Sequence, residues 1–211
     1  MTVGIIGSGA VGRALGKGFA ARGHDVTLGT RSPDRPELQA WARETGASLG
    51  SFADAAEAGE LLVFAVEWSG ARNAATLAGP ERTAGKVVLD TTNPLDFSTG
   101  APQLVALEAG SAGATVQAWF PEARVVKAFY NVGADLMVVP SLPGAPPTMF
   151  IAGDDAEAKE TAAEHIARFG WEAVDLGGID QSRYLEPLAV VWILEAMRTG
   201  SRDFALTVLR R

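Results

Sequence analysis

The amino-acid sequence predicts an α/β protein with a mostly parallel sheet that helices cover on both faces. Three observations support this fold class. Short runs rich in valine, isoleucine and leucine alternate with segments of helical periodicity from the first residues onward, the pattern of repeated strand–helix–strand units with right-handed crossovers. Several of these runs are continuously apolar, as strands buried on both faces are. Glycines are concentrated in the first strand-to-helix turn.

The N-terminal half is expected to form four strands and three helices. The run 3–6 is short and apolar, and residues 10–22 then carry apolar side chains every three or four positions, which predicts a strand followed by a helix. Ser51 is a typical N-cap for a short helix over residues 52–58. The remaining expected elements are strands over 25–28, 61–66 and 86–90 and a helix over 37–45.

The final third has a different pattern. Pro187 is expected to open a helix that contains the run LAVVWIL, and a helix that is apolar on all sides must be buried, in its own core or against another subunit. The other elements expected after the fourth strand are strands over 125–128, 148–151 and 172–176 and helices over 156–169 and 202–209.

A proline-rich stretch over 140–147 is the best candidate for a linker or a reshaped loop. We therefore expect residues 1–140 to form a nucleotide-binding domain. Residues 141–211 are expected to form a small C-terminal α/β and helical extension that completes the cleft for a second substrate and provides a subunit interface.

Composition excludes several classes of protein. The absence of cysteine excludes disulfides, thiolate zinc sites and cysteine nucleophiles, and two histidines are too few for a multi-histidine metal centre. A net charge of −7 disfavours nucleic acid and anionic membranes as partners. No apolar run approaches the ~20 residues that span a bilayer, and the chain opens without the basic segment of a signal peptide. We expect a soluble, cytoplasmic protein that acts on a small molecule without a metal.

The glycine pattern GSGAVG at 7–12 follows the first strand directly and opens the first helix, which is the context of a Rossmann dinucleotide-binding fingerprint. Gly7 permits the tight turn, Gly9 lets the backbone approach a pyrophosphate, and Gly12 lets the helix pack closely on the strand. The alternative is a glycine-rich turn that binds nothing. The backbone N–H groups expected to face the phosphates belong to Ser8, Gly9, Ala10 and Val11.

The end of the second strand distinguishes between two cofactors. An NAD site needs an acidic residue there to accept from the ribose 2′-hydroxyl, but this chain has GTRSPDR at 29–35. Thr30 and Ser32 supply hydroxyl groups, and Arg31 and Arg35 supply cations that suit a 2′-phosphate. The alternative is that both arginines are ordinary surface residues. The segment predicts NADP(H) as the cofactor.

Six segments in the same order resemble the family of deazaflavin-dependent NADP oxidoreductases, whose domain also occurs in the cytosolic part of membrane ferric reductases of the six-transmembrane type. The resemblance extends over almost the whole chain, and VVKAF and SRYLEPLAVVWI are its most particular parts. The matching segments are GSGAVG, GTRS, AVEW at 65–68, TTNPL at 91–95, VVKAF at 125–129 and GGIDQSRYLEPLAVVWI at 177–193.

This resemblance implies a homodimer that transfers hydride directly between NADP(H) and the deazaflavin coenzyme F420, its co-substrate, with the two rings stacked. Such chemistry depends on positioning more than on a protein acid or base, so no catalytic residue is assigned. It also implies that Val66 and Ala134 lie near the nicotinamide half and that Asn93 and Pro94 lie at the mouth of the cleft. Trp68 is expected either to wall the nicotinamide pocket or to serve helix packing.

One position departs from the family pattern. Relatives often have KAFN where this chain has KAFYN, so Tyr130 places a phenol where the second substrate is expected. Two alternatives stay open: an NADPH-dependent reductase of another flavin, quinone or small acceptor, and a non-catalytic NADP(H)-binding sensor module. Cations for an acidic coenzyme are expected late in the chain, at Arg183, Arg198, Arg202, Arg210 and Arg211.

Overall fold

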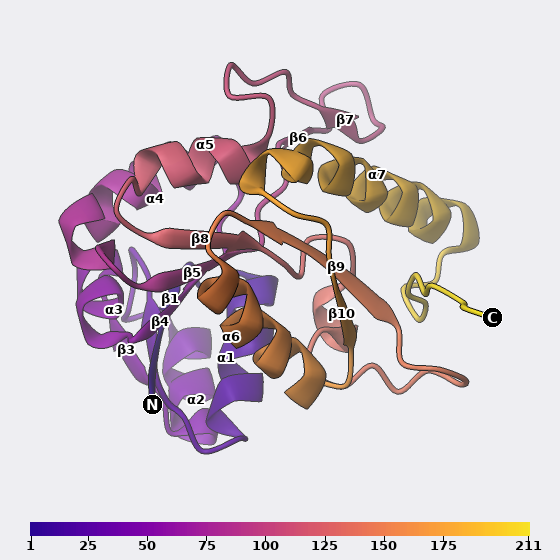
Figure 1. Cartoon of the computed structure of the whole chain (residues 1–211). Coiled ribbons are helices and arrows are strands. Elements are labelled where there is room, and N and C mark those ends of the chain that lie inside the picture. Colours follow the sequence, from indigo (N-terminus) through magenta and orange to yellow (C-terminus); the bar gives the residue numbers. More distant parts are fainter.

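A computed structural model describes all 211 residues and contains one eight-stranded sheet with helices on both faces (Figure 1). A separate two-stranded hairpin, β6 (Leu95–Asp96) and β7 (Gln103–Leu104), extends from one side of the molecule. The strands of the large sheet are β1 (Thr2–Ile6), β2 (Asp25–Gly29), β3 (Ser48–Gly50), β4 (Leu61–Phe64), β5 (Val87–Asp90), β8 (Arg124–Lys127), β9 (Thr148–Gly153) and β10 (Glu172–Asp175).

The sheet has the order β10-β9-β8-β5-β4-β1-β2-β3. Its six strands from β3 to β8 pair in parallel, with Ile5 opposite Leu28 on one side and opposite Val63 on the other. Strand β9 then runs antiparallel to β8, and β10 runs parallel to β9. The mostly parallel, doubly wound Rossmann-type fold predicted from the sequence is confirmed, and the last two strands continue the same sheet.

Helices cover both faces of the sheet and bury a separate core on each. Alternate residues of one strand serve the two cores: Val63 of β4 packs with Leu15 and Phe19, whereas Phe64 packs with Phe52 and Phe120. None of the helices is long and apolar enough to cross a membrane. Helices α1 (Ala10–Ala20), α2 (Pro36–Thr45) and α6 (Ala156–Arg168) contribute to the first core, with part of α7 (Ser182–Thr199); helices α3 (Phe52–Ala58), α4 (Trp68–Ala78) and α5 (Ala112–Trp119) contribute to the second.

The last helix begins earlier than the sequence predicts. Helix α7 begins at Ser182 and contains Pro187, so the proline does not open the helix; the 3-10 turn η3 (Ile179–Gln181) leads directly into it. The run LAVVWIL is buried on one side only, since Val191 is 53% and Leu194 48% exposed.

The helix expected over 202–209 does not form, and the segment is extended. The Thr148 N–H donates to the Leu206 carbonyl, and the Val208 N–H donates to the Thr148 hydroxyl. Phe204 stacks on Trp192 with ring centroids 5.2 Å apart. These contacts with the start of β9 and with α7 replace the hydrogen bonds of a helix, which explains the difference.

Two histidines that are distant in the sequence, His24 and His165, contact each other near the C-terminal end of α1. The rings of His24 and His165 lie edge to face, 5.6 Å apart, and both contact Phe19. Burial, together with the neighbouring His24 and Arg168, lowers the pKa of His165 to about 4. Burial also lowers the pKa of His24. Both side chains therefore favour the neutral form in the folded protein.

We expect this pair to make the fold sensitive to acid. Because His165 titrates near 6.5 when unfolded and about 4 when folded, the unfolded state binds more protons between these values. The stabilisation from neutral His165 is complete above about pH 6.5 and falls by up to about 3 kcal/mol toward pH 4. Urea unfolding at a series of pH values measures this slope. The variant His165→Leu should flatten it, and an unchanged slope in that variant would contradict the assignment.

Candidate functional site

A cavity of about 1100 Å³ lies at the carboxyl ends of the parallel strands, where ligands bind in open α/β sheets. Four segments line it, and each follows a strand: 7–11 after β1, 30–32 after β2, 65–70 after β4 and 91–93 after β5. The cavity therefore exists because the sheet brings the ends of these strands to one edge.

Most residues predicted from the sequence meet at this cavity. Gly12, Pro94 and Ala134 do not line it: Gly12 packs beneath the glycine turn, Pro94 is buried beside Asn93, and Ala134 begins the 3-10 turn η2 (Ala134–Leu136), which packs on α1. The predicted residues that line the cavity are Gly7, Ser8, Gly9, Ala10, Val11, Thr30, Arg31, Ser32, Arg35, Val66, Trp68 and Asn93.

The glycine turn has room for a ligand at one position and none at the two others. Gly7 has φ +124°, and a Cβ there would lie 2.1 Å from the Ala65 carbonyl oxygen. A Cβ at Gly12 would lie 2.0 Å from the Gly7 oxygen. Gly9 is the N-cap of α1, and a Cβ there would meet no atom within 4 Å. The turn thus opens only at Gly9, next to the free N–H groups that begin the helix.

Hydroxyl groups and cations form one end of the cavity. The Ser8 hydroxyl donates to the Thr30 hydroxyl at 3.0 Å, and the Ser32 N–H donates to the same oxygen at 3.2 Å. Arg31 is exposed and forms no ion pair, while Arg35 pairs with Glu37. This end therefore presents one free guanidinium beside ordered hydroxyl groups.

Arg13 also lines this end, and sequence reasoning did not identify it. Its Nη1 donates to the Ser8 carbonyl at 3.0 Å, so the guanidinium lies back over the glycine turn. The sequence contains the spacing that could have identified it, because Arg13 lies four residues after Gly9 and so one helical turn along the same face of α1.

The other end of the cavity is aromatic and apolar. Val66, Trp68, Leu95 and Phe97 line it, with the exposed carboxylate of Glu67 between Val66 and Trp68. The Trp68 ring stacks on Trp119 with centroids 5.5 Å and planes 18° apart. Trp68 therefore lines the cavity and also packs α4 against α5.

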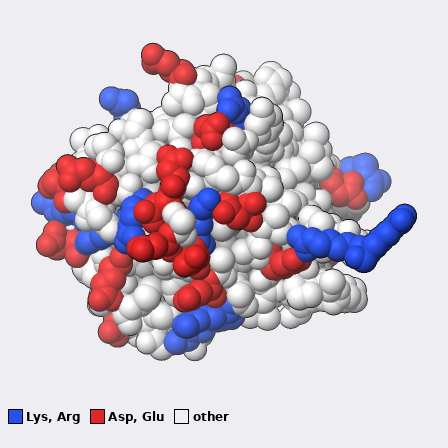
Figure 2. Space-filling model, in the orientation of Figure 1, with Lys and Arg blue, Asp and Glu red and all other residues white.

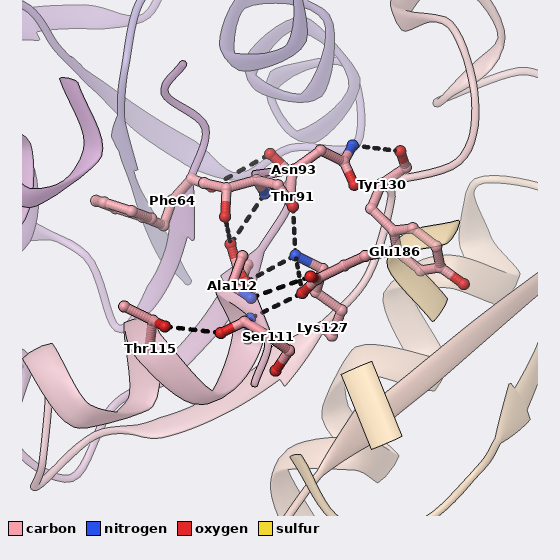
Figure 3. Close-up of polar contacts among 12 residues, drawn as sticks. Phe64, Thr91, Asn93, Ser111, Ala112, Thr115, Lys127, Tyr130 and Glu186 are labelled. Atoms are coloured by element: carbon pink, nitrogen blue, oxygen red, sulfur yellow. Dashed lines mark hydrogen bonds and ion pairs between the residues drawn. The ribbon is translucent and has the colours of Figure 1, made fainter. Parts of the chain in front are cut away.

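A buried ion cluster, formed by Lys127, Asp90 and Glu186, lies behind the segment 91–93 (Figure 3). The Lys127 ammonium is 3.0 Å from an Asp90 oxygen and 3.4 Å from a Glu186 oxygen, and it also donates to the Thr92 carbonyl. None of the three side chains is more than 3% exposed. The cluster joins β5, β8 and α7 directly below the cavity wall.

Tyr130 does not line the cavity, although a phenol was expected in the second-substrate site. Its side chain is 3% exposed, and its carbonyl accepts a hydrogen bond from the Asn93 amide at 2.7 Å. Burial, with Glu186 nearby, raises the pKa of the phenol. The structure therefore places the Tyr130 ring in the interior, beside Lys127 (Figure 3).

The late arginines also lie elsewhere, since none of the five lines the cavity. Arg183 pairs with Asp180, Arg198 with Glu195 and Arg210 with Glu172. Over the face seen in Figure 2, positive and negative side chains are interspersed without a broad patch of one sign. The cations of the cavity are all at its hydroxyl-rich end.

Comparisons with known proteins agree with this geometry. The family model described as "NADP oxidoreductase coenzyme F420-dependent" matches residues 2–94. The crystal structure of a candidate F420-dependent NADP reductase from Arthrobacter sp. FB24 is 37% identical, covers all of both chains and has a TM-score of 0.93.

Two further similarities are more distant. Metalloreductase STEAP3 of Rattus norvegicus is 28% identical over 192 residues, which are 88% of this chain and 36% of the relative, so this chain spans about a third of that protein. A reductive aminase from Aspergillus terreus, solved with NADPH and ethyl-5-oxohexanoate, is 24% identical over 94% of this chain and 63% of its own, with a TM-score of 0.65. This last similarity shows the fold alone.

The glycine turn generates a prediction on stability. The variant Gly12→Ala should lose about 2 kcal/mol of unfolding free energy, because its methyl group overlaps the Gly7 carbonyl. Gly9→Ala should change it by less than about 0.5 kcal/mol, since its methyl group meets no atom of the chain. Urea unfolding of the two variants provides the comparison. Equal losses would show that the helix and strand do not approach as described.

Proposed function

The chain belongs to the family of coenzyme F420-dependent NADP oxidoreductases, and we propose that it transfers hydride between NADP(H) and the deazaflavin coenzyme F420. One observation carries this proposal: a single cavity joins a cation-bearing, hydroxyl-rich end to an aromatic, apolar end across a glycine turn. NADP(H) needs this change of environment along the cavity, because its 2′-phosphate, pyrophosphate and nicotinamide differ in charge and polarity.

The glycine turn is the proposed pyrophosphate site. Gly9 leaves open space in front of the first turn of α1, and no acidic side chain stands in that turn. The N–H groups of residues 8–11 and the positive end of the helix dipole would then face the phosphates. The residues present fit the group, since a Cβ at Gly9 would occupy this space.

Arg31, Thr30 and Ser32 are the proposed site of the 2′-phosphate. The Thr30 hydroxyl is already ordered by Ser8 and by the Ser32 N–H, so a phosphate meets a prepared group rather than a mobile one. A guanidinium binds phosphate oxygens with two parallel hydrogen bonds. Arg35 joins the phosphate by leaving Glu37, which an exposed pair permits at little cost.

The apolar end is the proposed site of the nicotinamide. When bound, NADPH supplies the electron pair with a C–H hydrogen as hydride, and the acceptor takes this hydride and one proton from solvent. Val66, Trp68 and Asn93 shape the space in which the ring lies. The chain's part is to orient two rings and exclude water between them, so no side chain needs to exchange a proton.

Residues 141–211 are proposed to complete the second-substrate side and to support a homodimer. Val191, Leu194, Met197 and Tyr184 of α7 are exposed on its outer face, where a second copy would cover them. Sedimentation equilibrium distinguishes a dimer from a monomer directly.

The preference for NADPH over NADH tests the proposed 2′-phosphate site. Arg31→Ala should weaken NADPH binding by about 2–3 kcal/mol, the range for a charge-assisted contact, while NADH binding barely changes. Isothermal titration with both nucleotides measures the two effects. Arg43→Ala is the matched control, because Arg43 is an arginine of α2 outside the cavity. Equal weakening of both nucleotides would remove Arg31 from the 2′-phosphate site.

The acceptor is tested by mixing the protein, NADPH and oxidised F420 and following the absorbance of F420. Rapid bleaching is the expected outcome. A second candidate function, reduction of another flavin or of a ferric chelate, is favoured by the similarity to a metalloreductase. Parallel reactions with FMN and ferric citrate separate the two. Reduction of these acceptors alone would overturn F420 as the acceptor, and tight NADPH binding without turnover would leave a sensor.

A further inference from the structure

We infer that Lys127 is a positioning residue for hydride transfer, acting through the main chain of Thr92. This inference rests on the proposed function, because it takes the nicotinamide to lie against residues 91–93. Lys127 is the last residue of β8, is completely buried and does not itself line the cavity. Its contribution would therefore be indirect.

Three oxygen-bearing groups surround the Lys127 ammonium. It donates hydrogen bonds to Asp90, at 3.0 Å, and to the Thr92 carbonyl. A Glu186 oxygen lies at 3.4 Å and forms an ion pair with it. The Thr92 carbonyl is thereby held at a fixed distance from the end of strand β8.

Further hydrogen bonds, to Asp90, Phe64 and Tyr130, hold the rest of the segment 91–93 in place. The second Asp90 oxygen accepts from both the N–H of Thr92, at 2.9 Å, and its hydroxyl, at 2.7 Å. The Thr91 hydroxyl donates to the Phe64 carbonyl, and the Asn93 amide donates to the Tyr130 carbonyl. Figure 3 shows these bonds converging on one short stretch of backbone. This stretch forms the cavity wall between the ends of β4 and β8.

Stability alone does not explain such a cluster. Buried charges lose their hydration, and apolar side chains of similar size often stabilise a fold as well or better. The cluster instead fixes relative positions, because Glu186 also accepts from the N–H groups of Ala112 and Gly113, each at 3.0 Å. Helix α7, the start of α5 and two central strands thus share one junction. A misplacement of about 1 Å in a reacting group can lower a rate about 100-fold.

The test neutralises the whole cluster, so that no lone charge stays buried. The variant carries Lys127→Met, Asp90→Asn and Glu186→Gln. With NADPH and oxidised F420, we expect kcat to fall at least about 30-fold, while the KM for NADPH and the affinity for 2′,5′-ADP change less than about threefold. The deuterium isotope effect with NADPH labelled at the transferred hydrogen should rise, since hydride transfer becomes slower than product release.

A control variant removes another lysine–aspartate pair, which joins α6 to β10. Lys159 and Asp175 are 2.8 Å apart and lie away from the cavity. The variant Lys159→Met with Asp175→Asn should keep kcat unchanged. Thermal melting of both variants shows whether each is folded.

A rescue experiment covers the case in which the neutral variant does not fold. Because the chain has no cysteine, the thiol of Lys127→Cys can be aminoethylated in the unfolded state to restore an ammonium at nearly the same place. Wild-type protein carried through the same unfolding and refolding is the reference. Aminoethylation should restore most of the wild-type kcat.

The outcomes separate the two claims. An unchanged kcat in the folded neutral variant, or equal rates before and after aminoethylation, would overturn the role of Lys127. A loss of kcat matched by an equal loss of 2′,5′-ADP affinity would also overturn it, because the cluster would then act on the whole fold. Absence of turnover by wild-type protein with every acceptor would instead overturn the proposed function, and the inference with it.

Discussion

The structure depends on the close approach of backbones around β1, where side chains would not fit. A Cβ at Gly4 would lie 1.9 Å from the Ala55 carbonyl oxygen, and those at Gly7 and Gly12 would lie equally close to neighbouring carbonyls. Strand β1 can therefore touch α3 on one face, the end of β4 beside it and α1 on the other face. This contact brings the glycine turn and the loop after β4 together as facing walls of the cavity. A larger side chain at any of these positions would push the two cavity walls apart, even if it added no charged or polar group to them.

The two ends of the cavity are held in different ways, which suits the role proposed for each. The hydroxyl-rich end is exposed and built from short loops, so Arg31 stays free to move toward a charge in solvent. The apolar end rests on fully buried groups, and its backbone is tied to β8 and α7 through Lys127 and Glu186. Affinity for an anion tolerates mobile side chains, because attraction acts over several ångströms. The proposed alignment of two rings would not tolerate mobile side chains.

The sequence predicts the architecture well because its signals are local. Apolar runs identify β1, β4, β5 and β8, and the glycine pattern identifies the turn that opens the cavity. Helix α5 is missing from the prediction, since its sequence AGATVQAW has small residues and no clear polar face. The ion cluster is also missing, because Lys127 and Glu186 become neighbours only after α7 packs on the sheet. The extended tail has helix-forming residues, but the contact of Phe204 with Trp192 decides its conformation.

The stacked pair of Trp68 and Trp119 gives the molecule an internal optical reporter. The chain has five tryptophans, and Trp68 alone among them lines the cavity. The Trp68 ring stacks on Trp119 with centroids 5.5 Å apart, so a change at the cavity wall also alters the surroundings of a second indole. Trp41, Trp171 and Trp192 are buried away from the cavity. Of the five tryptophans, Trp68 is therefore the one whose ring a ligand in the cavity would contact directly, without any added label.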